Sequence, residues 1–212
     1  MVKHYQYFSE EDFQLIEKAI QQAEVKSRGE IVMMVVKKSA TFWEHYLLRA
    51  IFFTVMGTGI AVLENRFLGF SEESIRLWEW PLATLVIGLI VTSFPIVSRY
   101  LISSRQLEKR VYVRALREFT AQGLIQTKES TGILIFVSEF ERRVQILADS
   151  GINKKVASET WDIQVEEIVQ GIKTKAAGQA MAKAIGEMGD LLAQYFPATG
   201  ENPNELPNKP IH

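Results

Sequence analysis

Two long apolar stretches lie inside an otherwise polar sequence, and they constrain the fold more than any other feature. The first covers about residues 46–63 and the second about residues 80–102. Helices of about 18 and about 22 residues are about 27 and about 33 Å long, close to a bilayer core of about 30 Å. The sequence therefore predicts a two-span transmembrane hairpin joined by residues 64–79. The alternative is a buried helical hairpin in a soluble protein, which the length and uniform apolarity of the second stretch disfavour.

Positive charge is distributed unevenly around these stretches. Basic residues precede the first stretch and follow the second, whereas the loop between them holds two arginines and four acids. By the positive-inside rule, both polar ends of the chain are expected in the cytoplasm. The first residues lack the apolar core of a signal peptide, so the first span is expected to direct insertion itself. These features predict a protein with two spans and both termini cytoplasmic.

The overall charge and the amino-acid usage exclude several kinds of site. The net charge is -1 and no basic stripe is evident, which argues against a nucleic-acid partner. The chain has no cysteine, so it has no disulfide, thiolate metal ligand or cysteine nucleophile. The three histidines are scattered, and no serine-hydrolase elbow, phosphate loop or dinucleotide fingerprint is present. The sequence offers no complete catalytic constellation.

Outside the hairpin, the pattern alternates between helices and strands. Residues 8–28 predict an amphipathic helix in which Ser9 and Asp12 form a capping box. The helix over 103–122 is expected to continue from the second apolar stretch, and Ser158 is the expected cap of a later helix. The order predicts an α/β fold: a layered domain with a small mixed sheet flanked by helices. The remaining expected elements are strands over 31–36, 132–138 and 143–148 and helices over 158–172 and 176–196.

These elements divide the chain into four parts. Residues 1–45 and 103–196 are expected to form the two halves of one domain, because the first half alone is too short to fold well. Residues 46–102 form the hairpin that interrupts this domain. Residues 197–212 contain four of the six prolines, and we expect them to be a disordered tail.

Four stretches outside the hairpin resemble the TPM domain family. They are SRGEIVMMVVKK from Ser27, TGILIFVSEFERRVQILADSGI from Thr131, VASETWDIQVEEIVQGIKTKAAGQAMAKAIGEMGDLL from Val156, and YFP from Tyr195. The resemblance is to a membrane-hairpin branch of the family, and it implies a bacterial inner-membrane location. Soluble members carry a G-Y-G-L-E segment where this chain has residues 148–152. For some of those members acid phosphatase activity and calcium binding have been proposed.

Three carboxylates form the candidate metal site. Asp149 closes an expected strand, and Asp162 and Glu166 are four residues apart, on one face of the next helix. Carboxylate oxygens at such positions are ligands for Ca²⁺ or Mg²⁺. The alternative is that Asp149 caps a turn while the two helical acids form a solvated face.

Two further features have a functional and a structural interpretation. Glu139, Glu141, Arg142 and Arg143 crowd the turn between the second and third strands. The arginine pair would suit a phosphate, but a charged, solvent-exposed turn is the favoured interpretation. Trp161 is expected to fill the core rather than to stack on a ligand.

The sequence supports two hypotheses about function. In the first, the protein is a non-catalytic binding or assembly factor for a membrane protein complex, with the lipid bilayer and a membrane protein as its partners. In the second, it is a metal-dependent phosphatase or related hydrolase that acts at the three carboxylates. Gly57 and Ala61 form a small-residue pair that permits close helix packing, either within the hairpin or between two copies in a homo-oligomer.

Overall fold

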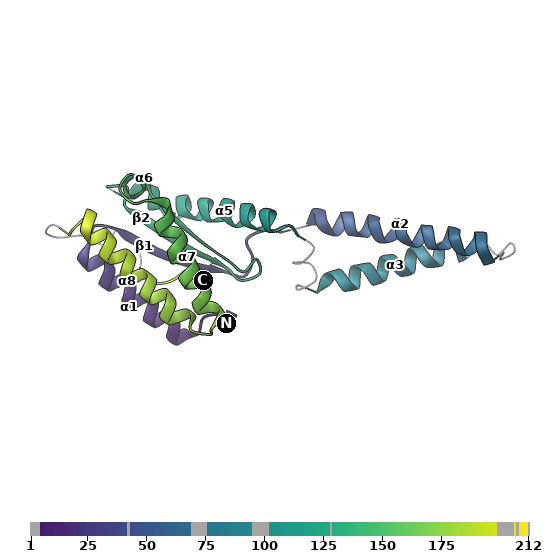
Figure 1. The fold of residues 1–212 in the computed structure, drawn as a ribbon, viewed down its shortest axis with the longest axis horizontal. Helices are drawn as coiled ribbons and strands as arrows, with labels where there is room; N and C mark the ends of the chain where they lie inside the picture. Colours follow the sequence, from purple (N-terminus) through teal and green to yellow (C-terminus); the bar gives the residue numbers. More distant parts are fainter. Residues whose placement is uncertain are drawn as a thin grey trace. The chain divides into compact units, whose positions relative to one another are not determined.

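The computed structural model describes residues 5–41, 43–68, 76–94, 102–127, 129–198, 206 and 208–211. The chain forms two compact units, which Figure 1 shows as ribbons. The α/β unit combines Met1–Ala40 with Glu108–His212, and the helical hairpin is Thr41–Leu107. Segments on the two sides of the hairpin therefore build one folded unit.

A three-stranded mixed sheet forms the centre of the α/β unit. The strands β1 (Glu30–Val36), β2 (Gly132–Ser138) and β3 (Arg143–Ala148) lie in the order β1-β2-β3. β1 and β2 run parallel, whereas β2 and β3 are antiparallel. Every residue of β2 is buried, as are six of the seven in β1, which fits strands that are covered on both faces.

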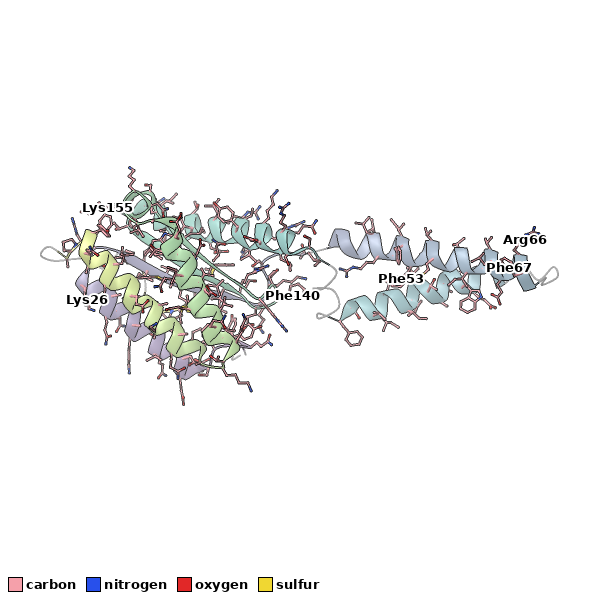
Figure 2. The ribbon with its side chains drawn as sticks, in the orientation of Figure 1. Lys26, Phe53, Arg66, Phe67, Phe140 and Lys155 are labelled. Atoms are coloured by element: carbon pink, nitrogen blue, oxygen red, sulfur yellow. The ribbon has the colours of Figure 1, made fainter. Side chains whose placement is uncertain are left out.

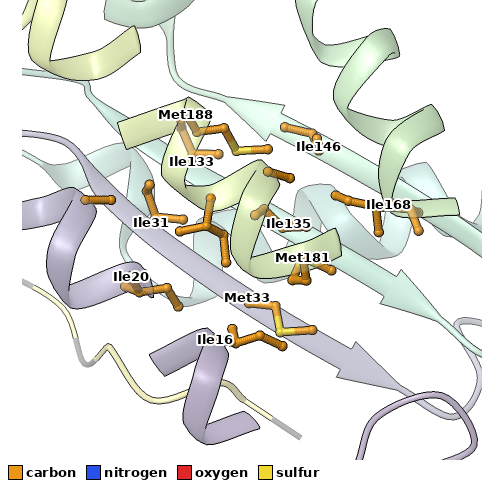
Figure 3. Packing of buried hydrophobic residues seen from close by; sticks show 14 of the residues in the cluster. Ile16, Ile20, Ile31, Met33, Ile133, Ile135, Ile146, Ile168, Met181 and Met188 are labelled. Carbon is orange, nitrogen blue, oxygen red and sulfur yellow. The ribbon is translucent and has the colours of Figure 1, made fainter. Parts of the chain in front are cut away.

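Three helices cover one face of this sheet. They are α1 (Glu10–Lys26), α7 (Ser158–Lys173) and α8 (Ala177–Tyr195). Figure 3 shows Ile16 and Ile20 of α1 meeting the side chains of alternate residues of β1. The same cluster includes Trp161, which fills the core as predicted. The other face is covered by α5 (Ser104–Ala121) and the short helix η1 (Leu124–Gln126), through Val111, Ala115, Phe119 and Leu124.

The start of α1 matches its sequence signal closely. The backbone N–H of Asp12 donates to the Ser9 hydroxyl at 3.1 Å, and the Ser9 N–H donates to the Asp12 carboxylate at 2.9 Å. The rings of Phe8 and Phe13 pack with centroids 5.8 Å apart across this cap. Local chemistry alone therefore fixes where α1 begins.

Three local predictions differ from the structure. Ala157 rather than Ser158 is the N-cap of α7, and no side chain caps that helix. The expected turn after Asp149 is a short helix, α6 (Ser150–Asn153). α5 begins as a separate helix at Ser104, because Ile102 and Ser103 are not helical. The first and third differences concern the exact residue at which a helix begins, and the second concerns a helix of four residues. A periodic pattern of apolar residues does not locate helix ends to within one or two residues.

The described part of the C-terminal segment lies along β1. The N–H of Val35 donates to the carbonyl of Ile211 at 2.9 Å, and the N–H of Ile211 donates to the carbonyl of Met33 at 2.9 Å. Pro197 also forms a bridge with Ser27. The sequence predicts disorder from residue 197 onward, whereas Ile211 adds one parallel bridge to the free edge of β1. Residues 199–205, 207 and 212 of the predicted tail lie outside the described residues.

Candidate functional site

The helical hairpin carries a large apolar surface. Its helices are α2 (Trp43–Leu68) and α3 (Arg76–Ser93). The segment Leu47–Glu64 of α2 has a mean hydropathy of 1.6, and only 11% of it is buried. Figure 2 shows Phe67 near the end of α2, where 80% of that residue is exposed. A core helix of a soluble protein would be mostly covered, so this surface needs an apolar partner.

The described residues contain one helix that is long and apolar enough to cross a membrane, and it is α2. The apolar part of α3, Glu79–Val91, is shorter than a full span. The predicted second span extends to residue 102, and its residues 95–101 lie outside the described part of the chain. Thus one candidate span is present by length and composition, whereas the two-span topology remains a prediction.

Small residues bring α2 and α3 together. A methyl group at Gly57 would lie 2.6 Å from the carbonyl oxygen of Trp80 and 2.8 Å from Cα of Pro81. The Thr84 hydroxyl lies 2.9 Å from the carbonyl of Phe53 on α2 and 2.7 Å from that of Trp80 on α3. The small-residue position that the sequence singled out therefore packs within the hairpin.

The three predicted metal ligands have separate structural settings. Asp149 is the N-cap of α6, and its side chain accepts from the N–H of Ser150 at 2.6 Å. Asp162 and Glu166 are exposed on α7. Among the residues that the structure describes, no group of three or more His, Cys, Asp or Glu side chains is arranged to hold a metal ion. The structure thus gives Asp149 the capping role and does not bring the three carboxylates together.

Two other carboxylates, Glu139 and Glu141, are buried at the end of β2. The Glu139 carboxylate accepts from the N–H groups of Gln6 at 2.5 Å and Tyr7 at 3.3 Å. Glu141 is fully buried and accepts from the N–H of Ser39 at 3.2 Å and from the Ser138 hydroxyl. The prediction of a solvent-exposed turn is therefore wrong for both glutamates. Each holds a distant segment against the turn, and nothing local in the sequence signals this.

Glu24 is a buried carboxylate on α1, beside the free edge of β1. It accepts from the N–H of Ile31 at 3.0 Å and from the side-chain amide of Asn208 in the C-terminal segment. Burial raises the pKa of Glu24 to about 8, and the nearby charge of Glu30 raises it further, while the two hydrogen bonds act in the opposite direction. This carboxyl is therefore protonated at neutral pH and links α1, β1 and the C-terminal segment.

A shallow hollow lies between α7 and α8. Ile163 lines it and is 61% exposed, beside Glu166, Gln170 and Ala180. Lys183 closes one side through ion pairs with Glu167 at 3.1 Å and Glu187 at 3.3 Å. These ion pairs raise the pKa of Lys183. An exposed isoleucine surrounded by charged groups suits contact with another protein better than chemistry on a small substrate.

Comparisons with known proteins found one matching family model and one similar solved structure. Residues 99–191 match the family model of the TPM domain. The NMR structure of the BA42 protein from the psychrophilic bacterium Bizionia argentinensis is similar, with a TM-score of 0.59 and 22% identity. The similarity covers 100% of this chain and 99% of that chain, and at this identity it concerns the fold alone. No curated protein matches the sequence. The match over residues 99–191 therefore confirms the resemblance to the TPM domain family that the sequence indicated.

Proposed function

We propose that this TPM domain protein is anchored in a membrane by its helical hairpin and acts as a binding or assembly factor for a membrane protein complex. The apolar surface of α2, of which the described residues bury only 11% over Leu47–Glu64, is the observation that carries this proposal. The charge distribution and the family resemblance support a location in the inner membrane of a bacterium, with both termini cytoplasmic.

Membrane anchoring is tested by alkaline extraction. The full chain should stay in the membrane pellet after a carbonate wash. The wash releases proteins that are held only by peripheral contacts, whereas an inserted apolar helix stays in the bilayer. A matched chain in which residues 41–107 are replaced by a short Gly-Ser linker should move to the supernatant. Release of the full chain by carbonate would contradict the anchor.

The absence of cysteine makes the topology directly testable. Single cysteines at Glu72, in the predicted external loop, and at Ser158, on the α/β unit, can be labelled with a membrane-impermeant maleimide. Intact spheroplasts should label the cysteine at 72 and leave the cysteine at 158 unlabelled until they are lysed. Labelling of both sites, or of neither, before lysis would contradict two spans with cytoplasmic termini.

The binding role is supported by the hollow between α7 and α8, where the side chain of Ile163 is exposed. In cells, cross-linking should capture a specific membrane protein with the native chain and lose it in Ile163→Asp. The matched control is Val25→Asp, which places the same change at an apolar residue of α1 that is 79% exposed. Equal capture by both variants would show that the hollow is not the binding surface.

The same purified chain discriminates between binding and hydrolysis. A binding factor should not turn over phosphate esters, with or without Ca²⁺ or Mg²⁺. Turnover that needs either ion and is abolished by Asp149→Asn would instead establish the metal-dependent hydrolase, with Asp162 and Glu166 as the other candidate ligands.

A further inference from the structure

The helix α5 has one buried face and one outward face of unusual composition. Buried residues recur every fourth position, and Val111, Ala115 and Phe119 pack on Val32 and Met34 of β1 and on β2. The outward face therefore takes no part in the core of the α/β unit. The side chains on this outward face determine which kind of partner it can bind.

Basic and apolar side chains alternate on the outward face of α5. Three large apolar residues are exposed there, Tyr112 by 45%, Val113 by 39% and Leu116 by 47%. The basic residues of α5 are also exposed, and they are Arg105, Lys109, Arg110, Arg114 and Arg117. By helical geometry the two acids, Glu108 and Glu118, flank the buried row, so the outward half of the helix contains none.

Charge sets α5 apart from the rest of the chain. Its five basic and two acidic residues give it a net charge of +3, whereas the whole chain carries -1. One acid, Glu118, is already paired with Arg114 at 2.7 Å. A helix face that combines exposed aromatic and aliphatic side chains with lysine and arginine is the composition of helices that lie in a membrane surface.

The position of α5 in the sequence points to the same partner. α5 begins at Ser104, two residues after the second apolar stretch ends at about residue 102. If that stretch is anchored, as the proposed function states, the chain cannot carry α5 far from the headgroups. Basic segments next to an anchor are attracted to anionic lipid.

We propose that the outward face of α5 binds the anionic surface of the bilayer, a contact that rests on the proposed anchor. The basic side chains contact lipid phosphates, while Tyr112, Val113 and Leu116 enter the boundary between headgroups and acyl chains. This contact fixes one face of the α/β unit against the membrane and leaves the hollow between α7 and α8, on a different pair of helices, for a protein partner.

The test uses the full chain reconstituted in vesicles, with an environment-sensitive fluorophore on Leu116→Cys. Vesicles of phosphatidylcholine alone are compared with vesicles that also contain phosphatidylglycerol. In the anionic vesicles, emission should shift to the blue and a water-soluble quencher should lose access. Neutral vesicles should show neither effect, and high salt should reverse both because it screens the attraction. Gln14→Cys, exposed on α1, carries the control fluorophore and should report water in every vesicle.

Charge variants separate docking from anchoring. Combining Lys109→Gln, Arg110→Gln and Arg117→Gln should restore quencher access at position 116, since each basic residue contributes about fivefold to surface binding. The anchor itself is checked in parallel by carbonate extraction of the same vesicles. A chain with its native basic residues that stays in the pellet while position 116 remains open to the quencher in anionic vesicles would overturn the α5 contact alone. A chain that washes out would overturn the anchor.

Two further outcomes contradict the proposal. Equal protection in neutral and anionic vesicles would show that headgroup charge is not recognised. Protection that appears in native membranes but in neither kind of lipid vesicle would assign this face to a protein partner.

Discussion

Glu24 joins three segments through one side chain. Its carboxyl accepts from the Ile31 N–H of β1 and from Asn208 of the C-terminal segment, while α1 holds it in place. Because burial outweighs these hydrogen bonds, the folded chain keeps the carboxyl protonated up to a pKa of about 8. A carboxyl in the unfolded chain loses its proton near its ordinary pKa of 4.5. The folded state therefore holds this proton over a range of pH in which the unfolded state does not.

The pH dependence of stability follows from this difference. The contribution of protonated Glu24 is complete below about pH 4.5 and is lost as the pH rises towards about 8, by an amount on the order of a few kcal/mol. Denaturant unfolding in detergent between pH 5 and 9 should show this decline. In Glu24→Gln, which has no proton to lose, the slope should be flatter. An unchanged slope would assign the pH dependence to other groups.

Two glycines of α8 make a matched pair. A methyl group at Gly189 would lie 2.5 Å from Cβ and 2.8 Å from Cα of Ala23 on α1, whereas one at Gly186 would meet nothing within 4 Å. We expect Gly189→Ala to destabilise the protein by about 1–3 kcal/mol through overpacking. Gly186→Ala should stabilise it by up to about 1 kcal/mol, because alanine favours the helix. Thermal unfolding of the two variants compares them, and a loss of stability in both would contradict this account.

At the scale of single residues, the sequence predicted the interactions between residues that are close in the chain. The Ser9–Asp12 capping box joins residues three apart, and the structure confirms it. Glu139 and Glu141 are held by Gln6 and Ser39, more than a hundred residues away, and their burial was missed. Asp149 was expected to precede a turn and is instead the N-cap of the short helix α6. A capping role and a metal-binding role leave the same local signal in the sequence.

The hairpin helices depend on close contact at Gly57. We expect Gly57→Ala to separate α2 from α3, because the added methyl group would meet the backbone of residues 80 and 81. Gly59→Ala is the control, since a methyl group there meets nothing within 4 Å. Amide exchange of α2 and α3 in micelles should be faster in the first variant and unchanged in the second. Equal exchange would mean that the helices associate in another way.

The C-terminal segment is the second element that can be tested. A chain that ends after Pro197 should lose the two backbone hydrogen bonds between Ile211 and β1, which are worth about 1–3 kcal/mol together. Exchange of the Val35 amide, which donates to Ile211, should then be faster. Removing His212 alone should leave this amide protected. Slow exchange in both chains would show that the segment does not cover the edge in solution.

Helices and strands were predicted well where one face of the element, or the whole element, is buried. The apolar runs of β1 and β2 and the four-residue spacing of Val111, Ala115 and Phe119 fix strand and helix without other information. The C-terminal segment was predicted to be disordered because its composition is rich in proline. Its described residue Ile211 pairs with the unpaired edge of β1, which is a property of the assembled sheet rather than of the local sequence.

At the scale of the whole molecule, the α/β unit should fold without the hairpin. Its sheet, both apolar clusters and the Ser9–Asp12 cap lie in Met1–Ala40 and Glu108–His212. A chain in which a Gly-Ser linker replaces residues 41–107 should keep the amide protection of β1 and β2. Loss of that protection in a soluble chain would mean that the hairpin contributes to the fold as well as to the proposed anchoring.

The pairing of β1 with β2 also determines when the protein can fold during its synthesis. Glu30 pairs with Gly132, so the first strand leaves the ribosome about a hundred residues before its partner. At about 5–20 residues per second, it waits on the order of 5–20 seconds. During that interval the apolar helices α2 and α3 emerge and can enter the bilayer. With the proposed anchor, the nascent chain would thus be threaded into the membrane before its α/β unit forms, with an exposed apolar strand that a chaperone would have to shield.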